Sequence, residues 1–453
     1  MIPAGDLVER VLRAARADET MCIVTDRAET NVRWAGGSPT TNGLTTARHW
    51  TVISLLRSTG GTRIGVVGSA STDPDAVAAV VRAAEDAARA AEPVDDTAPL
   101  VAGAEDPDWG DDAATTDFDV LAGVVDALAT GFGGPDPLYG YAEHAAETVT
   151  LGTSTGVRRR HVQPTGSIEI NAKRGDASVW VGAGTTDFTD VDTEALLADA
   201  ARRLDWSART VSLPAGRYET LLPPSTVADL LIPLMWAMEG RAAHEGRSAF
   251  AAPEGRTRVG ERLTSLPLAL VSDPTAPGIG YRPFVATESS GDALSLFDNG
   301  MTADAVEWIA DGTIAALAYS RASAHRFDAP VAVPGDNLIL HSHSTTDLDA
   351  MIASTEHGLL LTTLWYIRDV DPTTLLLTGL TRDGVYLVED GEVRAAVNNF
   401  RFNESPLDLL RRATEAGATE RTLPREWKDW FTRTAMPALR IPDFHMSSVS
   451  RAQ

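Results

Sequence analysis

The segment LIPLMWAMEGRAAHEGRSAF, Leu231–Phe250, combines a helical apolar pattern with the pair His244-Glu245. In the zinc-peptidase motif two imidazoles stand one helical turn apart so that both bind one ion, and a neighbouring glutamate polarises the metal-bound water. Ser248 stands four residues after His244, and no second imidazole is in reach. The segment therefore predicts a helix, and His244-Glu245 is not expected to bind zinc.

Length, charge and cysteine content limit the classes of function. A chain of 453 residues is expected to form two domains. The net charge of -24 opposes binding to a phosphate backbone, so nucleic acid is not an expected partner. No apolar run is long enough to span a bilayer, and the charged N-terminus does not resemble a signal peptide, which predicts a cytoplasmic protein without a membrane partner. Cys22 is the only cysteine, which excludes an intramolecular disulfide and a thiolate zinc cluster.

Residues 1–210 predict an N-terminal α/β domain built from a duplicated unit. A helix over 6–17 is followed by extended segments and a second helix, and the same order returns with helices at about 117–128 and 193–204. The acidic segment 92–119 between the two units contains ten acids and no lysine or arginine, and is expected to be a solvated linker. We therefore expect a duplicated helix-strands-helix unit that forms a mixed sheet with helices packed on it.

Residues 211–453 predict a C-terminal, mainly antiparallel β domain with one main helix. The helix is expected from about Thr226 to Arg241, with a kink where Pro233 removes a backbone donor. Alternating apolar segments follow, with turns at Asp311-Gly312 and Asp390-Gly391 that are typical of β-hairpins. The predicted fold class is α+β with two domains.

Few residues outside the helix are candidates for a catalytic, metal-binding or nucleotide-binding site. His341 and His343 have strand spacing, so both imidazoles would share one face, but a third metal ligand would have to come from elsewhere, and an exposed strand face is the favoured interpretation. The glycine-rich segments GSASTD and GAGTTD lack the Walker lysine and the dinucleotide-binding spacing, and no G-x-S-x-G elbow follows a strand. The residues by themselves predict no catalytic group and no metal ligand.

A family resemblance begins in the second domain and extends over essentially the whole chain. The segments that carry it, in order, are RYETLLPPSTVADLL (217–231), MEGRAAHEGRSAF (238–250), FDNGMTADAVEWIADGTIAALAYSRASA (297–324), LTGLTRDGVYLVEDGEVRAAVNNFRFNE (377–404) and MPALRIPDFHMSSVS (436–450). Together they resemble the TldD/PmbA family, the so-called modulators of DNA gyrase. No single motif is specific to the family, so the resemblance depends on the order in which the segments occur.

The resemblance also implies what the helix has lost. In the metal-bearing TldD branch this helix carries His-Glu-x-x-x-His, and a cysteine near the C-terminus completes the zinc site. With Glu239-Gly240 and Ser248-Ala249-Phe250 as landmarks, the three motif positions are Leu231, Ile232 and Trp236 here, and no cysteine follows Cys22. The chain therefore resembles the TldE (PmbA) branch, with no cofactor of its own and zinc expected in a partner subunit.

The function implied by the resemblance is that of a non-catalytic subunit. It would pair with a TldD-like metallopeptidase subunit in a heterodimer that degrades or trims flexible peptides, while exposed strand edges hold the extended peptide. Glu239 and Arg241 are the expected contacts with partner or substrate. Two alternatives stay open. The first is a self-sufficient metallopeptidase that uses an unrecognised site, such as His341 and His343 with a distant carboxylate. The second is a non-enzymatic peptide-binding or regulatory protein, which could form a homodimer.

Overall fold

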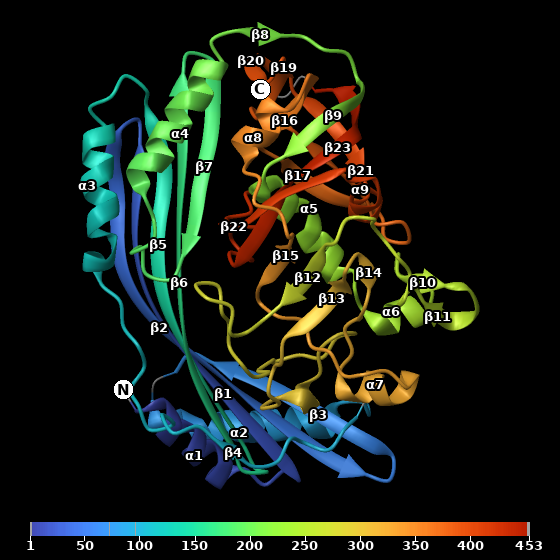
Figure 1. Ribbon diagram of the computed structural model, residues 1–453. Helices are drawn as coiled ribbons and strands as arrows, with labels where there is room; N and C mark the ends of the chain where they lie inside the picture. Colours follow the sequence, from blue (N-terminus) through green and yellow to red (C-terminus); the bar gives the residue numbers. More distant parts are fainter. Residues whose placement is uncertain (1, 72, 96, 451–453) are drawn as a thin grey trace.

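The computed structural model describes residues 2–71, 73–95 and 97–450. Its N-terminal part is one strongly twisted sheet in the order β3-β2-β1-β5-β6, with β7 and the short β4 both paired to β6 (Figure 1). All neighbouring strands are antiparallel except β4 and β6, so the sheet is mixed, as predicted. The strands are β1 (Glu19–Ala35), β2 (Ser38–Ser58), β3 (Gly61–Ser69), β4 (Ala104–Glu105), β5 (Leu138–Thr153), β6 (Val157–Arg174) and β7 (Ala177–Thr185).

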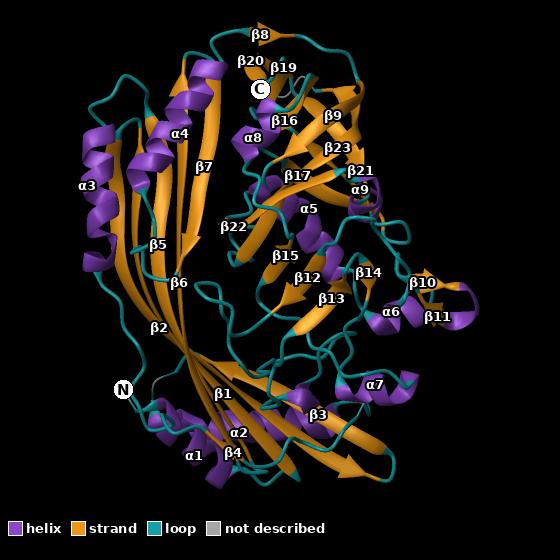
Figure 2. Ribbon diagram, viewed as in Figure 1, coloured by secondary structure: helices purple, strands orange, loops and turns teal. Residues whose placement is uncertain are grey.

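The helices of this sheet repeat the order of elements. The sequence α1-β1-β2-β3-α2 returns as α3-β5-β6-β7-α4, and the two halves meet where β1 pairs with β5. One pair of helices covers the lower end of the sheet and the other pair covers the upper end (Figure 2). The helices are α1 (Ala4–Ala14), α2 (Val77–Ala90, after a 3-10 turn at Pro74–Ala76), α3 (Ala122–Gly131, after a 3-10 turn at Phe118–Leu121) and α4 (Thr193–Trp206).

Local signals explain where these helices begin. The side chain of Asp192 accepts a hydrogen bond from the backbone N–H of Ala195, which caps the start of α4. Asp117 caps the 3-10 turn before α3 in the same way, through the N–H of Asp119. Because these caps are local, the predicted starts near residues 117 and 193 agree with the structure.

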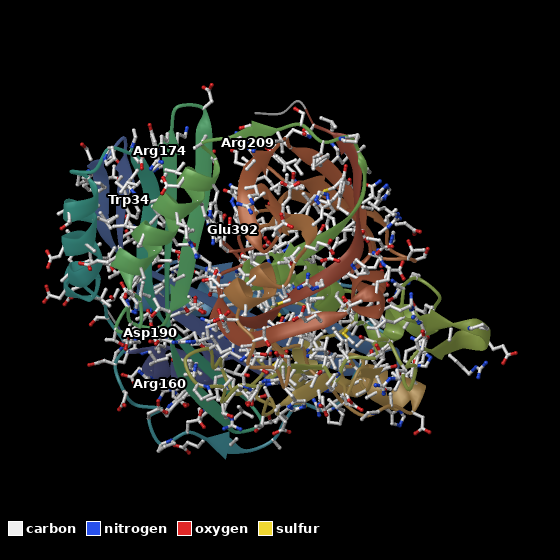
Figure 3. The ribbon with its side chains drawn as sticks, turned by 45° about the horizontal axis from the view of Figure 1, so that its top comes forward. Trp34, Arg160, Arg174, Asp190, Arg209 and Glu392 are labelled. Atoms are coloured by element: carbon white, nitrogen blue, oxygen red, sulfur yellow. The ribbon has the colours of Figure 1, made fainter. Side chains whose placement is uncertain are left out.

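The acidic segment 92–119, described except for residue 96, packs against the sheet. Asp106 pairs with Arg159 at 2.8 Å, and Asp108 pairs with Arg160, labelled in Figure 3, at 2.7 Å. The arginines come from β6, and β4 adds a short parallel pairing to the same strand. The expectation of a solvated linker is wrong for this part, because the arginines that neutralise its acids lie about fifty positions later in the chain.

The C-terminal part contains a large mixed sheet whose main path is β14-β13-β12-β15-β23-β9-β16-β19-β20-β8. Most pairings are antiparallel, while β15 with β23, β16 with β9, and β20 with β8 are parallel. The strands of the large sheet are β8 (Thr210–Val211), β9 (Gly216–Leu222), β12 (Ala269–Ser272), β13 (Val306–Ala310), β14 (Thr313–Ile314), β15 (Leu338–His341), β16 (His357–Leu361), β17 (Trp365–Asp371), β18 (Leu376–Leu380), β19 (Val385–Glu389), β20 (Glu392–Val397), β21 (Phe400–Glu404), β22 (Glu415–Thr422) and β23 (Thr434–Val449). A separate two-stranded sheet pairs β10 (Ala251–Ala252) with β11 (Arg256–Thr257).

The main helix, α5 (Pro224–Trp236), lies inside this domain, with nine of its 13 residues buried. Pro233 cannot donate to the carbonyl of Asp229 one turn earlier, and the indole Nε1–H of Trp427 donates to that carbonyl instead, at 2.8 Å. The remaining helices are short: α6 (Gly240–His244), α7 (Arg321–Phe327), α8 (Leu348–Ala353) and α9 (Pro406–Arg412), with 3-10 turns at Pro253–Gly255 and Leu296–Asp298.

The predicted helix over Thr226–Arg241 is wrong at its end, because α5 stops at Trp236 and Arg241 belongs to α6. The chain between the helices is held by a distant segment: the N–H of Gly240 donates to the carbonyl of Ala318 at 2.9 Å. A Cβ on Gly240 would lie 2.0 Å from the ring of Tyr319, so only glycine allows this close approach.

Ion pairs and hydrogen bonds tie the two parts together. Asp190, labelled in Figure 3, pairs with Arg421 of β22 at 2.5 Å, and Lys428 pairs with Glu169 of β6 at 3.3 Å. The hydroxyl of Ser178 on β7 donates to Asp383 at 2.5 Å. Within the described ranges, no helix is long and apolar enough to cross a membrane.

Candidate functional site

The three positions that the sequence analysis assigned to a metal motif, Leu231, Ile232 and Trp236, all lie on α5, but their surroundings differ. Leu231 and Ile232 are buried in the core of the domain, whereas Trp236 at the C-terminal end of α5 is 43% exposed. A zinc site needs nitrogen, sulfur or carboxylate ligands, and none of these three side chains supplies one. The residues at these positions therefore do not fit a zinc ion.

A second segment near the C-terminus packs directly against α5. The ring of Trp427 meets the ring of Trp236 edge to face, with centroids 5.0 Å apart. The N–H of Glu426 donates to the carboxylate of Asp229 at 2.9 Å, and the Glu426 carboxylate accepts from the N–H groups of Tyr366 at 3.1 Å and Ile367 at 3.0 Å. One chain of contacts therefore joins α5, the 425–427 segment and β17.

Burial changes the charge of these groups. It raises the pKa of Asp229 well above the usual aspartate range and raises the pKa of Glu426, while it lowers the pKa of the Arg425 guanidinium. Such shifts also occur in active sites, but the hydrogen bonds that the two carboxylates accept come from backbone N–H groups. The cluster therefore has a structural role. Sequence reasoning missed it, although an aspartate within the apolar run of α5 was a visible signal.

A cavity of about 440 Å³ opens beside this cluster, between α5, α6 and β17. Much of its lining is apolar and includes Trp236, Trp427 and Ile367. Four charged residues complete the lining: Glu239, Arg247, and Arg368 and Asp369 of β17. This cavity combines an apolar interior with a few polar groups, the usual composition of a binding site.

The structure separates the two residues expected to contact partner or substrate. Glu239 lines the cavity, half-buried, and burial raises the pKa of its carboxyl with further help from the nearby Asp292. Arg241 is not among the lining residues; it pairs with Glu245 at 3.0 Å and lies 3.8 Å from Asp292. Of the two, only Glu239 is placed to meet a ligand in this cavity.

His244 has a structural environment. Its Nε2 lies 3.0 Å from the Tyr319 hydroxyl and its Nδ1 lies 2.7 Å from the carbonyl of Gly255, so Nδ1 donates and Nε2 accepts. The ring also stacks on Phe327 at 4.3 Å between centroids. Both ring nitrogens of His244 are therefore used in hydrogen bonds within the fold.

His341 and His343 do not share a strand face. β15 ends at His341, and His343 lies beyond it with its side chain exposed. The strand ends because Ser342 instead donates its N–H to the hydroxyl of Thr419 at 3.0 Å. Among the residues that the structure describes, no three His, Cys, Asp or Glu side chains are grouped so that they could hold a metal ion.

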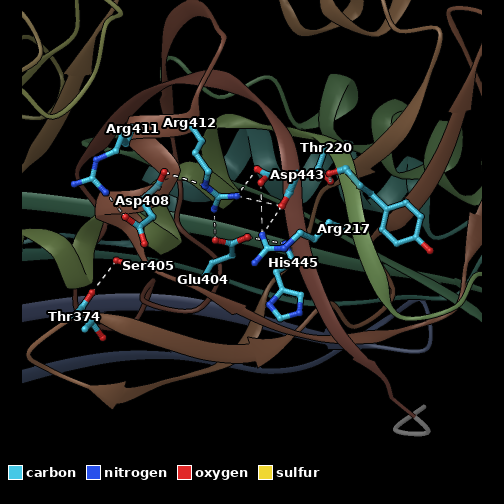
Figure 4. Close-up of polar contacts among 11 residues, drawn as sticks. Arg217, Thr220, Thr374, Glu404, Ser405, Asp408, Arg411, Arg412, Asp443 and His445 are labelled. Carbon is cyan, nitrogen blue, oxygen red and sulfur yellow. Dashed lines mark hydrogen bonds and ion pairs between the residues drawn. The ribbon is translucent and has the colours of Figure 1, made fainter.

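Residues of α9 help to line a second hollow, of about 570 Å³, which sequence reasoning did not find. Figure 4 shows the polar contacts among residues of its lining. Arg412 forms ion pairs with both Glu404 and Asp443, and Glu404 also accepts the N–H of His445 at 2.6 Å. Arg411 pairs with Asp408 within α9. The acids of this hollow are thus paired with arginines, unlike Glu239 of the first cavity.

Comparison with models of protein families gives a match in the C-terminal part of the chain. The family model of the PmbA/TldA metallopeptidase C-terminal domain matches residues 215–448. No curated protein matches the chain.

Three solved structures are similar over nearly the full length. TldE from Thermococcus kodakarensis has 16% identity and a TM-score of 0.77, with 97% of this chain and 98% of that chain covered. A proposed modulator of DNA gyrase from Bacteroides thetaiotaomicron has 14% identity and a TM-score of 0.77, with 98% of each chain covered. Another from Thermotoga maritima has 13% identity and a TM-score of 0.74, with 97% of this chain and 99% of that chain covered. At such identities the likeness establishes the fold.

Proposed function

The chain belongs to the PmbA/TldD metallopeptidase family, and we propose that it is a TldE-like subunit that has no zinc site of its own. The proposal is supported by the side chains on α5: Leu231, Ile232 and Trp236, the residues that the family resemblance matches to the metal motif, provide no metal ligand. A TldD-like partner supplies zinc and the hydrolytic step in a cytoplasmic heterodimer. This chain contributes the surface that holds a flexible peptide.

Strand β17 is the surface that suits an extended peptide. Among the described strands it pairs only with β18. Glu426 and Arg368 occupy the backbone N–H and carbonyl of Ile367, so the part of β17 left for a further strand begins at Arg368. Ile367, Arg368 and Asp369 of this strand line the cavity, and alternate side chains of a peptide added to the edge would face the same side. The Val370→Pro substitution, at an exposed position of β17, should raise the Michaelis constant of the complex relative to Val370→Ala. An unchanged constant would refute the use of this edge.

Reconstitution tests the subunit assignment. The purified chain and a TldD-like protein from the same genome are assayed separately and mixed, with an unstructured peptide as substrate. Cleavage should require the mixture and should vanish when the partner's two motif histidines are replaced by alanine. Cleavage by the chain alone would overturn the proposal, and an inactive mixture would favour a non-enzymatic peptide-binding protein.

A further inference from the structure

The cavity beside β17 has the walls that a long cationic side chain needs. The edge-to-face pair of Trp236 and Trp427 forms an aromatic corner, and Leu375 and Leu377 extend the apolar surface. Lysine and arginine have apolar stems that pack on such surfaces, and their charged ends are attracted to the faces of aromatic rings, to tryptophan most strongly.

Two carboxylates at the cavity have no cation of their own. Glu239 follows α5 and Asp369 lies on β17, so they come from different elements, and neither takes part in an ion pair in the described part of the chain. Their pKa values are both raised, with burial as the main cause and a neighbouring aspartate as the next, and Arg247 offsets only part of the rise at Glu239.

The two arginines of the same cavity are engaged with other acids. Arg247 pairs with Glu245 at 2.5 Å and with Asp292 at 2.8 Å. Arg368 lies 3.6 Å from the Glu426 carboxylate and donates to the carbonyl of Ile367 at 2.7 Å. Because the arginines are compensated and the two carboxylates are not, the charge left for a ligand is negative.

We propose that this cavity binds the side chain of a lysine or arginine in the peptide, with its stem against Trp236 and Trp427 and its charge between Glu239 and Asp369. The inference rests on the proposed function and specifies which peptides the subunit holds. The ligand is a basic side chain of an extended peptide that lies along β17. An acidic side chain at the same position would meet two like charges and is excluded.

The test compares peptides that differ only in charge at one position. Fluorescein-labelled, unstructured peptides of glycine, serine and alanine carry a single central lysine, acetyllysine or glutamate, and their binding to the isolated chain is followed by fluorescence anisotropy. Acetyllysine keeps most of the side-chain length but removes the positive charge. The lysine peptide should bind about tenfold more tightly than the acetyllysine peptide, and the glutamate peptide most weakly.

Variants assign the preference to the cavity. The double substitution Glu239→Gln with Asp369→Asn should reduce the difference between lysine and acetyllysine to less than about twofold. The matched control, Glu254→Gln with Asp311→Asn, removes the same charge from side chains that are 83% and 74% exposed elsewhere, and should keep the preference. Trp236→Ala should weaken the binding of both peptides, because both lose the aromatic wall.

Each outcome separates this inference from the function on which it rests. Equal binding of the lysine and acetyllysine peptides, absence of any binding, or an equal loss in the control variant would overturn the inference. None of these binding results bears on whether the chain alone cleaves peptides. The subunit assignment is therefore tested separately, by the reconstitution assay. A lysine preference that disappears only in the cavity variant confirms the site.

Discussion

The cavity beside β17 and the hollow lined in part by α9 are both rich in charged groups, but they differ in how the acids are compensated. In the hollow, Arg412 bridges Glu404 and Asp443 (Figure 4). In the cavity, Glu239 and Asp369 form no ion pair with any described residue. Burial raises the pKa of Glu404 as it does that of Glu239, so burial alone does not distinguish the two sites. Ion pairing distinguishes them, because acids paired with arginines stabilise the fold, whereas acids without an ion pair are available to a ligand.

The largest expected effect comes from breaking the paired site. Arg412→Met leaves Glu404, which is 4% exposed, without its cation and should lower the free energy of unfolding by about 3 kcal/mol. The double variant Arg412→Met with Glu404→Gln should recover much of that loss, because no buried charge is left. Urea denaturation followed by circular dichroism measures both values.

The matched substitution in the open cavity is Glu239→Gln. It removes an acid that has no ion pair, so its effect on the free energy of unfolding should stay within about 0.5 kcal/mol. A loss as large as that of Arg412→Met would contradict the distinction between the two sites.

An intermediate effect on the free energy of unfolding is expected for Trp427, which lines the cavity and also binds the backbone of α5. Trp427→Phe keeps an aromatic ring but removes the N–H that satisfies the carbonyl of Asp229, and should cost about 1–2 kcal/mol of unfolding free energy. Trp430→Phe changes a side chain that is 75% exposed and serves as the control, with little expected effect. Equal losses in thermal unfolding would show that the indole N–H does not replace the donor missing at Pro233.

The smallest effect concerns pH. Because the pKa of Glu404 is raised in the fold, the folded state keeps the proton to a higher pH than the unfolded state does. The free energy of unfolding contributed by this group therefore declines as pH rises from the ordinary glutamate pKa towards the raised one. Glu404→Gln should remove that decline, which denaturation curves recorded across this interval will detect. An unchanged slope would mean that Arg412 fully compensates the burial of Glu404.

Features fixed by neighbouring residues could be predicted from the sequence. The turn at Asp311-Gly312 between β13 and β14 and the turn at Asp390-Gly391 between β19 and β20 both occur, and their residues all have positive φ. The repeated order of helices and strands in residues 1–210 was visible for the same reason. The α+β fold class followed from these local patterns.

Features that depend on distant contacts could not be predicted. α5 ends before Arg241 because Ala318 binds the backbone of Gly240, and the acids of 92–119 find arginines on β6. The contact between Asp229 and Glu426 joins positions 197 residues apart, so the buried cluster beside the cavity could not be assigned from neighbours in sequence. Glu239 was selected through the family resemblance, and the structure places it at the cavity.

The account rests most directly on α5, where Leu231, Ile232 and Trp236 provide no metal ligand. Measuring the zinc content of the purified chain, alone and after assembly with a TldD-like partner, tests this claim. The account predicts no stoichiometric zinc in the isolated chain and one zinc site in the complex, lost when the partner's motif histidines are replaced. Stoichiometric zinc in the isolated chain, accompanied by peptide cleavage, would contradict it.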